Sequence, residues 1–173
     1  AFVTAFLCSF AFGLPKEQGN KEVLATTVAD GTFVAVAEGE LLPLENVNDP
    51  VFSSKAMGDG VAVNPTSNKV VSPVNGRVVS VFPTGHAYGI VREDGVEVLV
   101  HIGINTVELS GKGFEPAVQT GEHVQAGQVL AHFDRELVVS EGYDPTIMMI
   151  VTESKGKDIS LKHEGKVYAG DIL

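Results

Sequence analysis

Two histidines, His86 and His101, are the residues of this sequence whose type and spacing could carry out chemistry. Neighbouring imidazoles can bind a metal ion, act as an acid–base pair, or act as a nucleophile with a helper. They can also lie on the solvated face of a hairpin as ordinary polar residues. The other histidines, His123, His132 and His163, stand in polar turns or alternate within strands, and we expect them at the surface.

The two histidines flank the stretch GHAYGIVREDGVEVLVHIG, in which apolar runs lie on both sides of Asp94-Gly95. An Asp-Gly pair supplies the positive φ angles of a two-residue hairpin loop. With such a loop, Tyr88 faces His101 and His86 faces Gly103. The two histidines then share one face as diagonal neighbours, with Cα atoms roughly 7–8 Å apart. A register shifted by one residue would place them on opposite faces.

Phosphoryl transfer fits these residues better than zinc hydrolysis, because a zinc site needs further ligands. Zinc peptidases of the lysostaphin type use HxxxD and HxH motifs. Here Ile90 stands at the aspartate position after His86, and no second histidine follows His101. A neutral imidazole has a free lone pair, and the P–N bond that it forms is readily broken again. Leu99 would flank His101 on the same face, where an apolar surround excludes water.

The composition is that of an acidic chain with enough apolar residues for a core. The chain has 173 residues, room for one ordinary domain and an additional segment, and 44% of them are hydrophobic. Its formal net charge of −10 argues against binding to nucleic acid or to anionic membrane surfaces, since phosphates attract clustered Lys and Arg. The single cysteine, Cys8, excludes an internal disulfide.

Short alternating apolar runs separated by turn residues predict an all-β fold. We expect tight hairpin turns at Asn75-Gly76 and Asp94-Gly95, and only Arg135–Glu141 looks able to form a helical turn. The segment Val124–Leu130 resembles Val167–Leu173, and each predicts a strand, a glycine turn and the start of another strand. The predicted fold is a compact antiparallel β-sandwich or barrel with at most short helical turns. The expected strands include Thr32–Ala37, Gly60–Val63, Lys69–Val71, Arg77–Phe82, Ala87–Val91 and Val96–Ile102.

The sequence divides into three parts. Residues 1–14 carry no charge, and as a helix they would span roughly 21 Å, less than a bilayer core of about 30 Å. They also lack the basic start and the cleavage site of a signal peptide. We interpret residues 1–15 as the end of a membrane helix that begins upstream; the alternative is an apolar N-terminus packed on the domain. Residues 16–31 are polar and predict a linker, and residues 32–173 predict the folded domain.

The stretch Gly95–Val107, GVEVLVHIGINTV, resembles the motif around the phosphorylated histidine of glucose-type enzyme IIA domains of the sugar phosphotransferase system. That motif runs glycine, two variable residues, three apolar residues, then His-apolar-Gly-apolar-x-Thr-apolar, and every fixed position is filled here. The similarity continues through ENVNDPVFSSKAMGDGVAV, SPVNGRVVSVFPTGHAYGI, VELSGKGFEPAVQTGEHVQAGQVLAHFD and GKVYAGDIL, and so covers residues 34–173. It implies a compact antiparallel β-sandwich that acts as a phosphotransferase component.

By position, the resemblance implies that His101 is the phosphorylated residue. His86 would be the second active-site histidine, which stabilises the phosphoryl group, and Thr84 would orient His86 through its hydroxyl. The resemblance implies no required cofactor and no metal site, and a zinc ion bridging the two histidines would be incidental. The residues that it places at the partner-binding surface are Phe52, Phe82, Leu99, Asp49 and Val107.

Two positions depart from the family pattern. Asn105 stands where the family often has an acidic residue, so one charge at the rim of the site is lost. Leu99 stands where an aromatic residue can occur, which trims the apolar contact area.

The resemblance also implies partners and a location. The family accepts a phosphoryl group from the carrier HPr and passes it to a cysteine of enzyme IIB. Some relatives are free cytoplasmic proteins, whereas others follow a IIC membrane domain through a linker. Residues 1–31 resemble the second arrangement, the C-terminal part of a fused IIBCA-type sugar permease at the cytoplasmic face of the bacterial membrane. A zinc hydrolase on a related barrel and a purely regulatory binding module are the alternative functions, and the sequence does not identify the sugar.

Overall fold

The structure, a computed structural model, describes residues 28–173. The predicted stub at residues 1–15 and the linker as far as residue 27 lie outside the described residues. The described chain consists mainly of antiparallel strands, which confirms the all-β prediction. The strands are β1 (Gly39–Pro43), β2 (Asp59–Pro65), β3 (Lys69–Val71), β4 (Gly76–Val81), β5 (Ala87–Val91), β6 (Glu97–Ile104), β7 (Phe114–Pro116), β8 (His123–Val124), β9 (Val129–Phe133), β10 (Asp144–Glu153) and β11 (Gly165–Val167).

The helical segments of the described chain are short. Two are α-helices, α1 (Pro50–Ser53) and α2 (Arg135–Ser140), and two are 3-10 turns, η1 (Leu44–Asn46) and η2 (Thr106–Leu109). The helical turn expected at residues 135–141 is confirmed as α2, whereas α1 was not expected. Between residues 28 and 173 no helix is long and apolar enough to cross a membrane.

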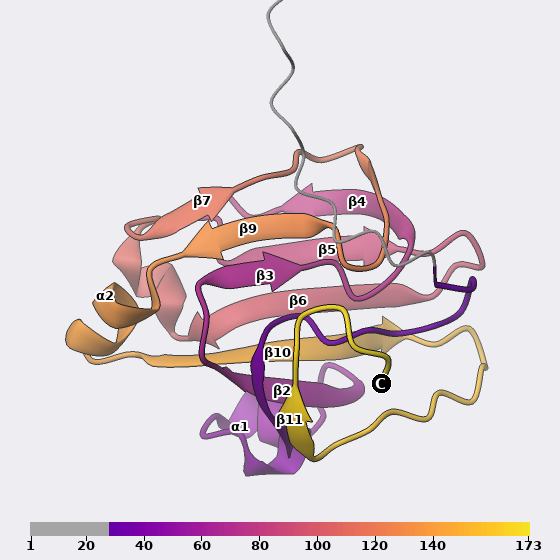
Figure 1. The fold of residues 1–173 in the computed structure, drawn as a ribbon, viewed down its shortest axis with the longest axis horizontal. Helices are drawn as coiled ribbons and strands as arrows, with labels where there is room; N and C mark the ends of the chain where they lie inside the picture. The colour runs from indigo at the N-terminus through magenta and orange to yellow at the C-terminus, as the bar shows by residue number, and fades with distance from the viewer. Residues whose placement is uncertain (1–27) are drawn as a thin grey trace, which may run out of the picture.

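The strands form two sheets that pack face to face. The larger sheet has the order β11-β1-β2-β10-β6-β5-β4-β8, and the smaller sheet has the order β3-β9-β7. Figure 1 shows the smaller sheet lying over β4 and β5 of the larger one. Val70, Leu130 and Phe133 from the smaller sheet and Val78 and Ile90 from the larger are buried in one hydrophobic cluster. The predicted β-sandwich is therefore confirmed.

The central strand β10 is buried on both of its faces. Ile147 and Met149 point into the cluster between the sheets, whereas Met148 and Ile150 point into a second cluster on the outer face, which η1 and α1 cover. In the sequence this strand reads as the unbroken apolar run 147–151, without alternation. An unbroken run is the pattern of a strand buried on both sides, and alternation between apolar and polar residues therefore does not predict this strand.

The hairpin of β5 and β6 has a different register from the one expected. Ala87, not Tyr88, lies opposite His101, because the loop has three residues, 93–95, and not two. Gly95 takes a φ of +85°, and its N–H donates to the Arg92 carbonyl at 3.0 Å. A type I turn followed by a left-handed glycine closes such a three-residue loop. The prediction of a two-residue loop at Asp94-Gly95 was therefore wrong.

The pair Asn75-Gly76 does not form the predicted hairpin turn either. The strands on its two sides, β3 and β4, belong to different sheets, so the chain crosses from one layer to the other at this point. Gly76 does not take a positive φ. A Cβ atom at this position would instead come within 2.6 Å of the Val91 carbonyl oxygen. The glycine thus permits a close approach of two backbones.

The first expected strand, Thr32–Ala37, is a segment buried from Phe33 onward that makes one isolated β-bridge, from Val34 to Ile172, and bends at residues 36–37. Its backbone bonds to both sides: the Val34 N–H donates to the Pro73 carbonyl at 2.9 Å, and the Ala35 N–H donates to the Asp171 carbonyl at 2.7 Å. The segment therefore links the start of β4 to the C-terminal end of the chain, although it is not a regular strand.

The two similar heptapeptides have the same local structure, as predicted. Gly127 and Gly170 take φ values of +85° and +93° in turns that follow β8 and β11. The Gly127 N–H donates to the Ser72 carbonyl at 2.8 Å, and the Gly170 N–H donates to the Ala35 carbonyl at 2.9 Å. In both copies a short strand is followed by a glycine turn. The residues after the turn then pair with another part of the chain: β9 pairs with β3, and Ile172 pairs with Val34.

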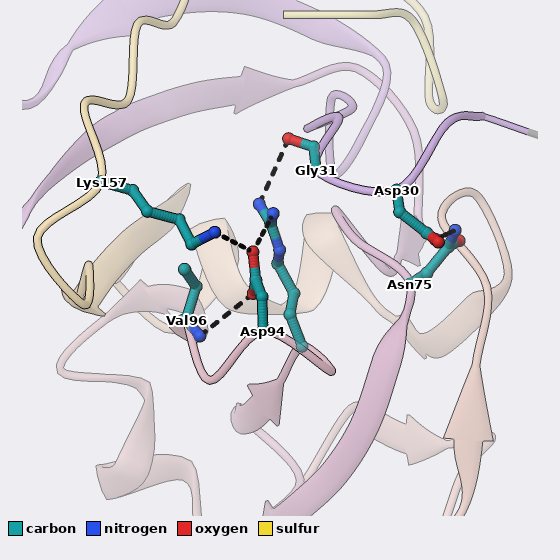
Figure 2. A network of polar contacts seen from close by, with 7 residues as sticks. Asp30, Gly31, Asn75, Asp94, Val96 and Lys157 are labelled. Atoms are coloured by element: carbon teal, nitrogen blue, oxygen red, sulfur yellow. Dashed lines mark hydrogen bonds and ion pairs between the residues drawn. The ribbon is translucent and has the colours of Figure 1, made fainter.

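A polar network holds the beginning of the described chain against the tip of the β5–β6 hairpin (Figure 2). The buried guanidinium of Arg92 donates to the Gly31 carbonyl at 3.2 Å and to the Asp94 carboxylate at 2.6 Å. Lys157 forms a second ion pair with the same carboxylate at 3.1 Å. Figure 2 also shows Asp30 accepting a hydrogen bond from the Asn75 amide, at 3.3 Å. The last residues of the predicted linker are therefore attached to the domain.

Candidate active site

His101 lies on β6 and faces the outer side of the larger sheet, opposite Met148 of β10. Its ring is partly buried. Nδ1 lies 2.8 Å from the Gly103 carbonyl oxygen. A carbonyl can only accept a hydrogen bond, so Nδ1 carries the proton and the neutral ring keeps its free lone pair on Nε2. Gly103 takes a φ of +77°, and this left-handed conformation turns its carbonyl back toward the ring.

His86 lies beside His101, as the sequence predicted, but for a different reason. The ring centroids are 5.0 Å apart and the ring planes meet at 79°. In the observed register, simple alternation from Tyr88 would send residue 86 to the core face. However, residue 86 precedes the first residue of β5 and follows Gly85, whose φ is +70°. This turn directs the His86 ring to the His101 side, so the predicted contact is right and the predicted register is wrong.

Thr84 contacts His86 directly. Its hydroxyl lies 2.5 Å from His86 Nδ1, and this contact leaves Nε2 as the remaining ring nitrogen. A hydroxyl can donate or accept, so the contact fixes the orientation of the ring in either tautomer. The side chain of His86 is only 4% exposed, so its ring has little room to rotate away.

The site favours neutral imidazoles. Burial, followed by the nearby His86, lowers the pKa of His101 to about 4, against smaller opposing effects of the Gly103 carbonyl and the Asp49 carboxylate. Burial also lowers the pKa of His86. At neutral pH both rings are therefore uncharged, which is the state in which an imidazole is a nucleophile.

Aromatic and aliphatic side chains surround the two rings. The Phe52 ring lies 5.0 Å from the His101 ring and the Phe82 ring lies 5.5 Å from the His86 ring. Phe52 is only 8% exposed and packs with Leu99 in the outer cluster, so these two side chains form a wall of the site. Phe82 and Val107 are 44% and 50% exposed, so they are open to a partner.

Asp49 has a structural role at the rim. It is the N-cap of α1, and its Oδ1 accepts hydrogen bonds from the Val51 and Phe52 N–H groups at 2.8 and 3.2 Å. This cap, with Pro50 at the first helical position, positions Phe52 against His101. The sequence NDP contains the signal for this helix start, an N-cap aspartate followed by proline, and it would have predicted α1.

The three other histidines lie away from this site, at the surface. His123, His132 and His163 are exposed, as predicted. In the part of the chain that the structure describes, no group of three or more His, Cys, Asp or Glu residues could hold a metal ion. His86 and His101 together supply two imidazoles.

A comparison with protein families identifies the family of this chain. The family described as phosphoenolpyruvate-dependent sugar phosphotransferase system, EIIA 1, matches residues 31–157, which include both histidines. The chain belongs to this family. As an EIIA domain it is a phosphotransferase component, a phosphoryl relay in sugar uptake.

Individual relatives of this EIIA domain carry two kinds of name. The β-glucoside-specific EIIBCA component of Dickeya chrysanthemi is 40% identical over 186 residues, which cover all of this chain and 30% of the relative. The glucose-specific EIIA component of a Staphylococcus epidermidis strain is 46% identical over 116 residues, which cover 67% of this chain and 70% of the relative. The chain thus spans less than a third of the EIIBCA and EIICBA relatives that it matches.

A solved structure supports the same identification of this EIIA domain. The glucose permease IIA from Mycoplasma capricolum superposes with a TM-score of 0.78 and is 37% identical. The superposition covers 87% of this chain and 97% of the other.

Proposed function

We propose that His101 accepts a phosphoryl group from phospho-HPr on Nε2 and donates it to a cysteine of enzyme IIB. The observation that carries this proposal is the bond from His101 Nδ1 to the Gly103 carbonyl, because it leaves the lone pair on Nε2 of a neutral ring. The Nε2 lone pair attacks phosphorus, a P–N bond forms on His101, and the donor nitrogen recovers its electron pair. In the second step a cysteine thiolate attacks phosphorus, a P–S bond forms, and the P–N bond returns its electrons to Nε2.

The apolar surround supports a relay rather than hydrolysis. Phe52 and Leu99 pack beside His101, and the exposed Phe82 and Val107 can bury further area against a partner. A phosphoryl group held between these surfaces has few water molecules as competing acceptors. Such a contact is typical of transient partners, which bury little area and separate quickly.

His86 is proposed to stabilise the phosphoryl group on its neighbour. Its ring is 5.0 Å from that of His101, so an Nε2–H of His86 can donate to a phosphoryl oxygen. The negative charge of a phosphoryl group would favour the protonated form of His86, which strengthens this bond. Thr84 holds the ring in the required orientation from the Nδ1 side.

The relatives named EIIBCA and EIICBA components support a domain that is fused to other parts of a sugar permease. We place the domain at the cytoplasmic face of a bacterial membrane, linked to the IIB and IIC parts of a sugar permease. HPr would reach the domain from solution, and IIB would reach it within the same assembly. No required cofactor enters either step.

The test is labelling with phosphoenolpyruvate, enzyme I and HPr. Wild-type protein should gain one phosphoryl group that is labile in acid and stable in alkali, as phosphoramidates are. His101→Ala should lose the label, whereas His163→Ala, an exposed histidine outside the site, should keep it. A label that persists in His101→Ala would disprove the proposed function.

A further inference from the structure

The direction of the His86 side chain requires a local explanation, because β5 does not provide one. Tyr88 and Ile90 of this strand point into the cluster between the sheets, and Ala87 lies opposite His101. Strand alternation would give residue 86 the same direction as Tyr88. Its ring contacts His101 instead. The backbone must therefore depart from the strand conformation between residues 84 and 87.

The turn at Gly85 makes this departure, and several contacts hold it. The Gly85 N–H donates to the Phe82 carbonyl at 2.7 Å, and φ at Gly85 is +70°. A Cβ atom at Gly85 would come within 3.1 Å of Pro116 on β7, so the turn is packed closely against its neighbour. On the other side, the His86 carbonyl accepts from the Ile102 N–H at 2.7 Å.

A further polar group of the turn, the Gly85 carbonyl, is held by a side chain. The Tyr88 hydroxyl donates to it at 3.0 Å, and both groups are buried. Tyr88 is 0% exposed, so its phenol has been removed from water to make this bond. Burial raises the pKa of the phenol, and the hydroxyl therefore keeps its proton and remains a donor. The Gly85 carbonyl belongs to the same peptide group as the His86 N–H, so its direction determines how His86 is oriented.

We propose that Tyr88 is a positioning residue for His86: its hydroxyl holds the Gly85 carbonyl, and thereby the turn that directs the His86 imidazole to His101. This inference rests on the proposed role of His86 in phosphoryl transfer. Tyr88 reaches the reacting atoms only through His86, because its ring lies in the cluster between the sheets.

The test begins with Tyr88→Phe, which removes one oxygen and keeps the ring in the core. The control is Tyr168→Phe, which removes the same oxygen from a side chain that is 55% exposed beyond β11. Transfer from phosphorylated His101 to purified IIB should slow roughly twofold to tenfold in Tyr88→Phe, the range expected for one neutral hydrogen bond. It should be unchanged in Tyr168→Phe.

A double-mutant cycle shows whether Tyr88 acts through His86. In a His86→Gln background, adding Tyr88→Phe should cause no further slowing, because the group that Tyr88 positions is already absent. The same factor of slowing in both backgrounds would overturn the inference. A wild-type transfer rate in His86→Gln would overturn it as well, whereas a persistent label in His101→Ala would reject the proposed function.

The nitrogen chemical shifts of the imidazole rings, measured by NMR, report the environment of His86 directly. A loss of stability alone does not change these shifts in the folded protein. The His86 ring shifts should change in Tyr88→Phe and stay constant in Tyr168→Phe, and constant shifts in both variants would overturn the inference. The wild-type protein offers a measurement that needs no folded variant. The Tyr88 hydroxyl proton should exchange slowly and show an NOE to the Gly85–His86 peptide, and a rapidly exchanging hydroxyl without that NOE would also overturn it.

Discussion

Thr106 lies directly against Gly103, so that a Cβ atom added at Gly103 would overlap the threonine methyl group. The Thr106 hydroxyl donates to the Ile102 carbonyl at 2.5 Å, and the whole Thr106 residue is buried. The φ of Gly103, +77°, is one that side chains rarely allow. The carbonyl that orients His101 therefore belongs to a peptide with little conformational freedom.

Gly103→Ala should damage both stability and the site. The left-handed conformation and the overlap with Thr106 together should lower the free energy of unfolding by about 2–4 kcal/mol. Labelling of His101 should slow, because the Gly103 carbonyl moves. The control is Gly142→Ala, which has a φ of +89° but nothing within 4 Å of the added Cβ. Equal losses in the two variants, measured by chemical unfolding and labelling rate, would contradict this account.

His86→Gln should separate the two halves of the relay. Glutamine keeps a donor of similar reach and loses the option of a positive charge. We expect labelling of His101 to persist and transfer to IIB to slow roughly tenfold to a hundredfold, the effect of losing a charge-assisted hydrogen bond of about 1.5–3 kcal/mol. Single-turnover transfer from labelled protein measures this rate. A wild-type rate would show that His86 does not assist the transfer.

The lowered pKa of His101 predicts a dependence of stability on pH. The unfolded chain binds a proton at position 101 below pH 6.5, whereas the folded chain does so only near pH 4. Folding is therefore disfavoured as the pH falls through this window. At pH 5 the cost is on the order of 2 kcal/mol, at about 1.4 kcal/mol for each unit.

His101→Ala should remove this cost. Its free energy of unfolding should fall less than that of wild type between pH 7 and pH 5, as chemical unfolding at each pH would show. His163→Ala is the matched control, and it should follow the wild-type curve. Parallel curves for wild type and His101→Ala would contradict the lowered pKa.

The exposed Phe82 ring beside His86 predicts part of the docking surface. Phe82→Lys should slow labelling by HPr and transfer to IIB by about tenfold, because a lysine charge would have to be desolvated at the contact. Phe82 is 44% exposed, so its replacement should leave the melting temperature nearly unchanged. Phe52 is a poorer probe, because it is buried and its replacement would disturb the outer cluster.

The control for Phe82→Lys is Ile172→Lys, in a side chain that is 58% exposed near the C-terminal end of the chain. This variant should relay phosphoryl groups at the wild-type rate. Similar slowing in both variants would place the docking surface elsewhere.

The sequence predicted the strands and the residues of this site better than it predicted the hairpin register and the orientation of His86. Alternating apolar runs located β5 and β6, and the motif around His101 located the site, because both depend on neighbouring residues. The loop at Asp94 could not be predicted in the same way. Its carboxylate is held by Arg92, by Lys157 and by the Val96 N–H, and Lys157 is distant in sequence. Likewise, the orientation of His86 depends on a turn packed against β7, which no local pattern reveals.

Arg92, itself held by Asp94, fixes Gly31 at the tip of the β5–β6 hairpin. This attachment sets the distance that a domain joined before residue 28 would have to cover to reach the histidines. Arg92 is separated from Ala87, at the His101 end of the hairpin, by five residues, or about 17 Å. A chain of twelve residues, the length of segment 16–27, extends to at most about 40 Å. A module joined through a segment of that length would therefore have enough reach to meet the face that carries His101, although the attachment point lies at the other end of the hairpin. Such a tether would raise the local concentration of the acceptor to the millimolar range and still leave that face open to a carrier diffusing in from solution.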